Sequence, residues 1–185
     1  MNLLFEAAAD IGGFLNGNGW RYCIIGGLAL QRWGEPRTTL DVDLTLLTGF
    51  GNERPYIDAI LANYDPRIAD AAEFALRRRV LLIKAKNGKD IDISLGGFPF
   101  EEETVRRARS FEFAKGVTLP ICSAEDLFVM KMFAGRGKDI DDAKGIAARQ
   151  ELDTGYIVRH LEFLLEAKGA PEMMAEALRI LGTRP

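Results

Sequence analysis

Hydrophobic and polar residues alternate strictly over two stretches of the chain. Over residues 40–46 the even positions are leucine or valine, and the odd positions are Asp41, Asp43 and a threonine. Residues 89–95 repeat the pattern, with isoleucine and leucine on one side and Asp92 among the polar positions on the other. A period of two is typical of a β-strand with one buried face. We therefore expect two strands that each present acidic side chains on the face opposite the core.

The first two thirds of the chain mixes strands with helices. Runs of aromatic and β-branched residues predict further strands, over residues 20–25, 80–85 and 111–121. Apolar residues at helical spacing predict helices over residues 4–15, 28–33 and 55–63, and residues 100–109 resemble an exposed, charged helix. Asn87-Gly88 is a strong hairpin signal, so the strand before it should pair with the strand after it. Residues 64–76 give no clear pattern.

From residue 122 onward the pattern is helical throughout. A helix should begin with a capping box at Ser123 and end at Gly135, and others should begin near Asp139 and Pro171. The fold class predicted is α+β. A short mixed β-sheet flanked by helices should form a core over residues 1–121, and a C-terminal helical region, residues 122–185, should pack on it.

Composition agrees with a folded enzyme-sized domain. The 185 residues are 48% hydrophobic and 28% charged, which excludes disorder as the main state. We expect no membrane span, because no apolar run approaches about 18 residues. The acidic N-terminal segment lacks the basic start of a signal peptide, so a cytoplasmic location is expected. Cys23 and Cys122 are far apart and indicate reduced thiols rather than a disulfide framework or a zinc site.

The charge balance argues against broad binding of nucleic acids. The formal net charge is −3, whereas proteins that bind nucleic acids nonspecifically are usually basic. Two local clusters of arginine stand out, Arg77–Arg79 and the set Arg106, Arg107 and Arg109. Solvated surface is the favoured interpretation of both clusters, and a phosphate-binding surface is the alternative.

The paired aspartates suggest a metal site. Residues i and i+2 of a strand lie about 6.5–7 Å apart on one face, so Asp41 and Asp43 place two carboxylates together. Oxygen ligands of this kind suit Mg²⁺, and two such ions can clamp the attacking and leaving oxygens of a phosphoryl-type transfer. Asp92, in the interior of the second strand, is preferred to Asp90 beside the turn as a third carboxylate. Two solvated strand faces are the alternative, but aspartate is depleted in strands.

Gly26-Gly27 follows the strand at residues 20–25 and opens a helix. Glycine lets the backbone approach a ligand closely, and the N–H groups at a helix start bind phosphate. Taken alone, the pair is more simply explained as a turn.

Together these segments resemble a known family. The stretch IIGGLALQRWGEPRTTLDVDLTL is similar to the signature of the DNA polymerase β-type nucleotidyltransferases. Arg37-Thr38-Thr39 before the acids, and SAEDLFVMKMFAGRGKDIDD further on, resemble the AbiEii/AbiGii toxin group of these enzymes. The resemblance covers residues 20 to 145 and implies the nucleotidyltransferase fold for this region.

The resemblance also implies roles for the residues of the metal site. Asp41 and Asp43 would bind Mg²⁺, as part of a two-metal site. Asp92 would be the third ligand and the general base toward the acceptor hydroxyl. Gly26 and Gly27 would hold the triphosphate of an NTP.

Further residues are assigned to substrate binding. Lys131 matches the helix lysine that contacts the nucleotide, although ordinary snorkelling of its side chain to water would explain it equally well. Thr39 belongs to the Arg-x-Thr element, and Arg37 could hold a phosphate by a bidentate contact or be a surface arginine. Asp139 and Asp142 match acids of the family. The roles of these two residues, and of Asp90, stay open.

The function predicted is transfer of a nucleoside monophosphate from an NTP to an acceptor hydroxyl, with release of pyrophosphate. The resemblance implies a toxin that acts on tRNA, another RNA or a protein, and an antitoxin is a possible partner whose existence the sequence leaves open. The acidic net charge mildly favours a second possibility, a cationic small-molecule acceptor of the antibiotic type. A third possibility is a non-catalytic protein that binds nucleotides or a partner. Clustering of Asp92 with Asp41 and Asp43 would favour the enzyme.

Overall fold

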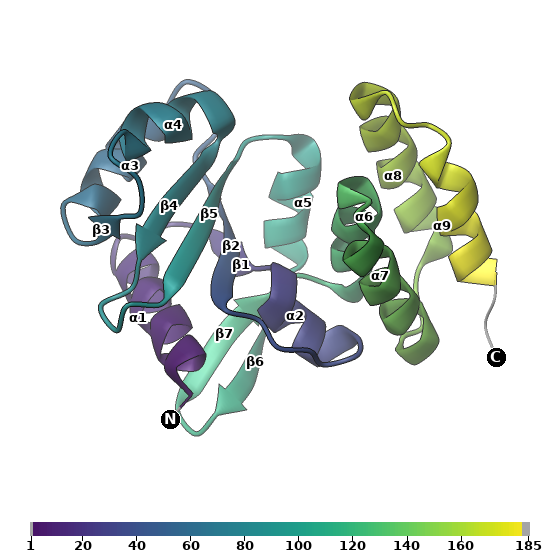
Figure 1. The fold of residues 1–185 in the computed structure, drawn as a ribbon, viewed down its shortest axis with the longest axis horizontal. Helices are drawn as coiled ribbons and strands as arrows, with labels where there is room; N and C mark the ends of the chain where they lie inside the picture. The colour runs from purple at the N-terminus through teal and green to yellow at the C-terminus, as the bar shows by residue number, and fades with distance from the viewer. Residues whose placement is uncertain (1, 183–185) are drawn as a thin grey trace. The chain divides into compact units, whose positions relative to one another are not determined.

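The computed structural model describes residues 2–182 (Figure 1). Residue 1 and residues 183–185, at the outer ends of the two predicted regions, lie outside the described residues. The chain forms two compact units. The first comprises the described residues up to Leu28 together with Thr38–Cys122, and the second comprises Ala29–Arg37 together with the described residues from Ser123 onward.

A mixed seven-stranded sheet forms the centre of the first unit, in the order β3-β4-β5-β2-β1-β7-β6. Its strands are β1 (Tyr22–Ile24), β2 (Asp41–Leu47), β3 (Asp65–Pro66), β4 (Val80–Lys84), β5 (Asp90–Gly96), β6 (Arg109–Ala114) and β7 (Val117–Ile121). The pairs β2–β5 and β1–β7 are parallel, and the other pairs are antiparallel. The α+β prediction is confirmed, as are the alternating strands at residues 40–46 and 89–95.

The alternation of apolar and polar residues explains how β2 and β5 sit in the sheet. Val42, Leu44, Ile91 and Ile93 are fully buried, whereas the aspartates between them are half-buried. The Asn87-Gly88 turn joins β4 to β5 as predicted, and Gly88 has the positive φ of 82° that such a turn requires.

Helices flank this sheet: α1 (Leu3–Gly17), α3 (Glu53–Leu61), α4 (Ala71–Arg78) and α5 (Pro99–Arg107). Helix α1 packs on β7 and β2, α4 packs on β4 and α3, and α5 packs on β2 and β1 (Figure 1). The expectation of an exposed helix near residues 100–109 is wrong in part, because α5 buries Phe100, Thr104 and Val105. Helix α2 (Gly26–Trp33) begins in the first unit and continues into the second.

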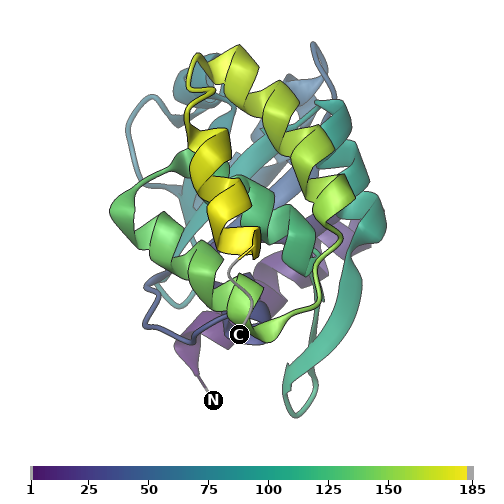
Figure 2. The same ribbon diagram turned by 90° about the vertical axis from the view of Figure 1, so that its right-hand side faces the viewer.

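The second unit contains α6 (Ala124–Ala134), α7 (Gly137–Arg149), α8 (Thr154–Lys168) and α9 (Met173–Gly182). Helix α6 packs against each of the other three (Figure 2). The predicted caps of α6 are confirmed. The Ser123 hydroxyl accepts a hydrogen bond from the Asp126 N–H, and Gly135 ends the helix at a φ of 70°. Over residues 2–182 no helix has the length and apolarity needed to cross a membrane.

Candidate active site

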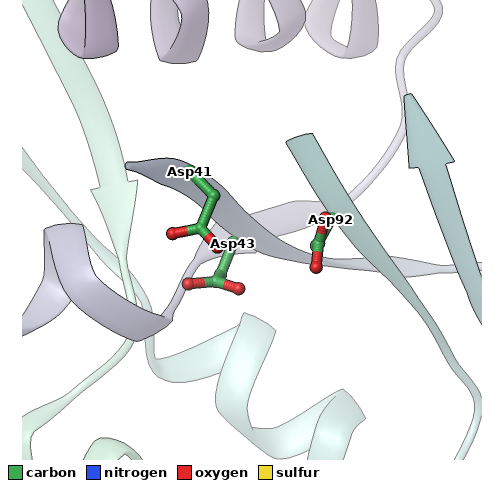
Figure 3. Close-up of side chains that lie close together, drawn as sticks. All are labelled: Asp41, Asp43 and Asp92. Atoms are coloured by element: carbon green, nitrogen blue, oxygen red, sulfur yellow. The ribbon is translucent and has the colours of Figure 1, made fainter. Parts of the chain in front are cut away.

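Three aspartates of the central strands lie together on one face of the sheet. Asp41 and Asp43 belong to β2, and Asp43 is in register with Asp92 of the parallel neighbour β5. One carboxylate oxygen from each residue lies within 4.8 Å of the other two. Figure 3 shows the three side chains extending from the strands to the same side. The juxtaposition expected from the sequence is therefore present.

The sequence enforces this arrangement through its hydrophobic pattern. Shifting a strand by one residue moves every side chain to the opposite face. In β2 or β5 such a shift would bury the aspartates and expose isoleucine, leucine and valine. Burial of the aliphatic face thus fixes which way the carboxylates point.

The Gly26-Gly27 turn packs directly against the acids. Gly26 has a φ of +59°, and a Cβ at this position would lie 2.0 Å from Oδ2 of Asp43. A Cβ at Gly27 would lie 2.4 Å from the hydroxyl oxygen of Thr39. The Gly27 N–H donates a long hydrogen bond, 3.5 Å, to Oδ2 of Asp43. Both glycines are thus required by close approach, and the start of α2 lies beside the acidic cluster.

Thr39 contacts a proposed metal ligand. Its hydroxyl lies 2.9 Å from Oδ1 of Asp41 and donates a hydrogen bond to it. This bond restricts the orientation of the Asp41 carboxylate. Whether Thr39 also contacts substrate stays a prediction.

Sequence reasoning missed one residue of the cluster, Arg67. It follows β3, and its guanidinium is hydrogen-bonded to Oδ1 of Asp92 and lies 3.6 Å from Oδ2 of Asp90. Burial raises the pKa of Asp92, Arg67 opposes this, and the charges of Asp41 and Asp90 raise it further. Lys84 and Arg67 lower the pKa of Asp90 despite partial burial. The sequence around residue 67 has no periodic pattern, so the contact between Arg67 and Asp92 becomes evident only from the order of the strands in the sheet.

The cluster has the chemistry of a divalent cation site. Three half-buried carboxylates supply hard oxygen ligands, which Mg²⁺ prefers. Their mutual repulsion would be relieved by a cation, and Asp41, Asp43 and Asp92 are the residues that fit it.

The predicted substrate ligands Arg37 and Lys131 lie in the second unit, where both contact Asp142. Arg37 forms a bidentate pair with Asp142, through bonds of 2.9 and 3.0 Å. Nζ of Lys131 lies 2.8 Å from Asp142 and 3.3 Å from Asp139, and Asp139 is also bound by Arg136. We call these five residues the α6–α7 ion cluster.

Burial distinguishes this cluster from surface ion pairs. The side chain of Lys131 is 8% exposed, so it does not snorkel to water, and Asp139 is fully buried. Burial alone would raise the pKa of each aspartate. The bonds from Arg136 and Lys131 to Asp139, and from Arg37 and Lys131 to Asp142, lower it instead. The nucleotide contacts of Arg37 and Lys131 stay predictions. The ion pairs of Asp139 and Asp142, in contrast, are given by the structure.

The arginine cluster at the end of α4 is not a uniform surface. Arg77 and Arg78 are exposed, but Arg79 turns inward at a φ of 55°. Its guanidinium pairs with Glu53, donates to the carbonyls of Gly49 and Leu95, and lies over the ring of Phe50. Arg79 therefore holds loops of the first unit together.

Comparisons with known proteins give a family match and a fold match. Residues 23–183 match the family model described as "Nucleotidyl transferase AbiEii toxin, Type IV TA system". The chain is 15% identical to an antigenic nucleotidyltransferase-like protein from Paracoccidioides brasiliensis, with a TM-score of 0.52 over 95% of this chain and 92% of that one. It is 14% identical to ANT(2")-Ia, solved in complex with adenylyl-2"-tobramycin, with a TM-score of 0.50 over 97% of each chain. At such identities the likeness shows the fold alone. A comparison with curated proteins gave no match.

Proposed function

The chain belongs to the AbiEii family of nucleotidyltransferase toxins, and we propose that it is a Mg²⁺-dependent enzyme that joins a nucleoside monophosphate from an NTP to a hydroxyl group of RNA. Membership of the family makes it a nucleotidyltransferase, and the metal and the acceptor are our proposals. The clustering of Asp41, Asp43 and Asp92 within 4.8 Å is the observation that supports the metal most directly. A non-catalytic binding protein on this fold would not need these three acids together.

In this proposal the triphosphate lies between the acidic cluster and the start of α2. Asp41, Asp43 and Asp92 hold divalent cations, which when bound supply the positive charge that a triphosphate and its transition state require. The N–H groups of Gly26 and Gly27 donate to phosphate oxygens, since the start of a helix favours anions. Thr39 keeps Asp41 in the orientation that the site needs.

The transfer itself exchanges one phosphorus–oxygen bond for another. Asp92 accepts the proton of the acceptor hydroxyl, and that oxygen forms a bond to the α-phosphorus. The bond from the α-phosphorus to the bridging oxygen of the β-phosphate breaks, and pyrophosphate leaves. Asp92 is the candidate for this role because it is the one acid of the cluster that β5 contributes beside the two acids of β2.

RNA is the acceptor we favour, with tRNA as the first candidate. The exposed Arg77 and Arg78 lie in the same unit as the acids and supply charge for a phosphate backbone. A protein acceptor is an outcome of the same test. The net charge of −3 supports the alternative of a cationic small molecule, and ANT(2")-Ia was solved with an adenylylated compound of that kind. The proposal includes a cytoplasmic site of action and a cognate antitoxin, in keeping with a type IV system.

The test supplies the full chain with Mg²⁺, each α-labelled NTP in turn, and separate preparations of total RNA, protein and an aminoglycoside. We expect label from one NTP to appear in RNA, and to be lost with EDTA. A double variant, Asp41→Asn with Asp43→Asn, should abolish labelling. Asp58→Asn is the matched control, because Asp58 is an exposed aspartate of α3 that pairs with Arg54.

Each outcome changes the proposal in a defined way. Label in protein or in the aminoglycoside would replace the RNA acceptor and keep the reaction. Undiminished labelling by the double variant would refute the metal site.

A further inference from the structure

Arg67, in the segment that follows β3, reaches the acidic cluster past β4. Its N–H donates to the carbonyl of Leu82 at 3.0 Å, and Leu82 is the register partner of Asp92. Arg67 therefore lies level with Asp92, on the side of it away from Asp43. Its side chain is 25% exposed and ends at the Asp92 carboxylate. Arg67 thus forms an ion pair with Asp92, the acid that β5 contributes to the metal site.

A guanidinium and a metal ion compete for the same carboxylate oxygens. Arginine keeps its proton under all ordinary conditions, so it cannot vacate Asp92 by becoming neutral. We propose that Arg67 takes the place of a cation at Asp92 in the metal-free protein and competes with the divalent metal for that carboxylate. Arg67 thereby sets how tightly the site binds metal. This inference rests on the metal site of the proposed function.

Asp90 keeps the displaced guanidinium nearby. Its Oδ2 lies 3.6 Å from Nε of Arg67, while its Oδ1 binds Nζ of Lys84 at 2.7 Å. When a metal occupies Asp92, Arg67 therefore retains Asp90 as a carboxylate partner, two residues away from Asp92 on β5. This arrangement gives Asp90 a function that its position beside the turn did not suggest.

Removing the charge of Arg67 should make the site bind metal more tightly. Arg67→Gln removes the charge but keeps a polar, if shorter, side chain, so the Kd for Mn²⁺ should fall by about two- to fivefold, as expected for loss of one partly exposed ion pair. Arg67→Lys keeps the charge without the planar fork, so its Kd should lie between the two. Arg54→Ala is the control, because it removes an exposed, ion-paired arginine of the same unit and should leave the Kd unchanged.

The measurement is a Mn²⁺ titration of the full-length chain without nucleotide, followed by the EPR signal of free Mn²⁺. It is repeated in an Asp92→Asn background, where the carboxylate for which Arg67 competes is absent. Arg67→Gln should then leave the Kd unchanged. Circular dichroism and the urea midpoint establish that each variant is folded, and Arg67→Lys provides the comparison if Arg67→Gln is not.

The outcomes separate this inference from the proposed function. If Arg67→Gln, or Arg67→Lys in its place, binds Mn²⁺ as the unaltered chain does or more weakly, Arg67 does not compete with metal. An effect that persists with Asp92→Asn would also overturn the inference, because Arg67 would then act without Asp92. Failure of the unaltered chain to bind Mn²⁺ would refute the metal site itself and the inference with it.

Discussion

Replacing Lys131 by methionine should destabilise the second unit by about 3 kcal/mol. Methionine nearly preserves the length of the side chain but leaves Asp139 and Asp142 without one of their buried partners. Removing one member of a buried ion pair typically costs about 3–5 kcal/mol. The lower end applies here, because Arg136 and Arg37 still contact the two aspartates.

Urea unfolding measures this loss, with tryptophan fluorescence as the signal. Trp33 lies in the second unit and Trp20 in the first, so a Trp20→Phe background reports the second unit alone. For a slope of about 2 kcal/mol per molar urea, the midpoint should fall by about 1.5 M. Lys144→Met is the control, because Lys144 is exposed and pairs only with Asp141 among the ion pairs described; its midpoint should move little.

The difference between Lys131→Met and the unaltered chain should shrink in acid. Folding lowers the pKa of both aspartates, because the bonds from Lys131, Arg136 and Arg37 outweigh burial. The native state then binds fewer protons than the unfolded state. The stability from this source is complete above about pH 4 and is lost as the pH falls through the folded-state pKa values. A midpoint for Lys131→Met equal to that of Lys144→Met at pH 7 would refute this account and leave Lys131 to its predicted nucleotide contact.

The contacts around Asp41 and Asp43 lead to the other predictions. Thr39→Ala removes the hydrogen bond to Asp41 and should raise the Kd for Mn²⁺ about tenfold, whereas Thr39→Ser should restore it; equal values for the two variants would exclude the hydroxyl as the cause. Gly26→Ala adds a Cβ that would clash with Asp43 in a left-handed backbone, so it should raise the Kd at least about tenfold and cost about 1–2 kcal/mol of stability. Gly13→Ala is its control, since nothing lies within 4 Å of that added Cβ, and similar Mn²⁺ binding by the two alanine variants would contradict the argument.

Strict periodicity made the centre of the sheet predictable. The alternation over residues 40–46 and 89–95, with the turn at Asn87-Gly88, defines strands whose apolar faces must be buried. Residues 64–76 could not be interpreted, because β3 is only two residues long and has no period, and α4, which begins at Ala71, buries only two alanines. The burial of α5 was missed since its many charges conceal Phe100 and Val105, which become a buried face only against β2 and β1.

The acids of the site were predictable for the same reason, but their partners were not. Spacing alone placed Asp41 beside Asp43, and the interior position of Asp92 favoured it over Asp90. The contact with Arg67 depends on which strands are neighbours, and local sequence does not reveal this. The burial of the charge on Lys131 likewise depends on α7 packing against α6, which brings aspartates to it from eight and eleven residues along the chain.

The segment Ala29–Arg37 makes the two units inseparable by a single cut of the polypeptide. It belongs to the second unit, yet it lies in the sequence between the glycine turn and the first acids of the site. Within that unit Leu30 is fully buried, and Leu30 and Ile146 both lie beside Gly34. A chain that stopped at residue 122 would keep every acid of the site but expose Leu30. We therefore expect removal of the residues from Ser123 onward to destabilise the segment between the glycine turn and Asp41.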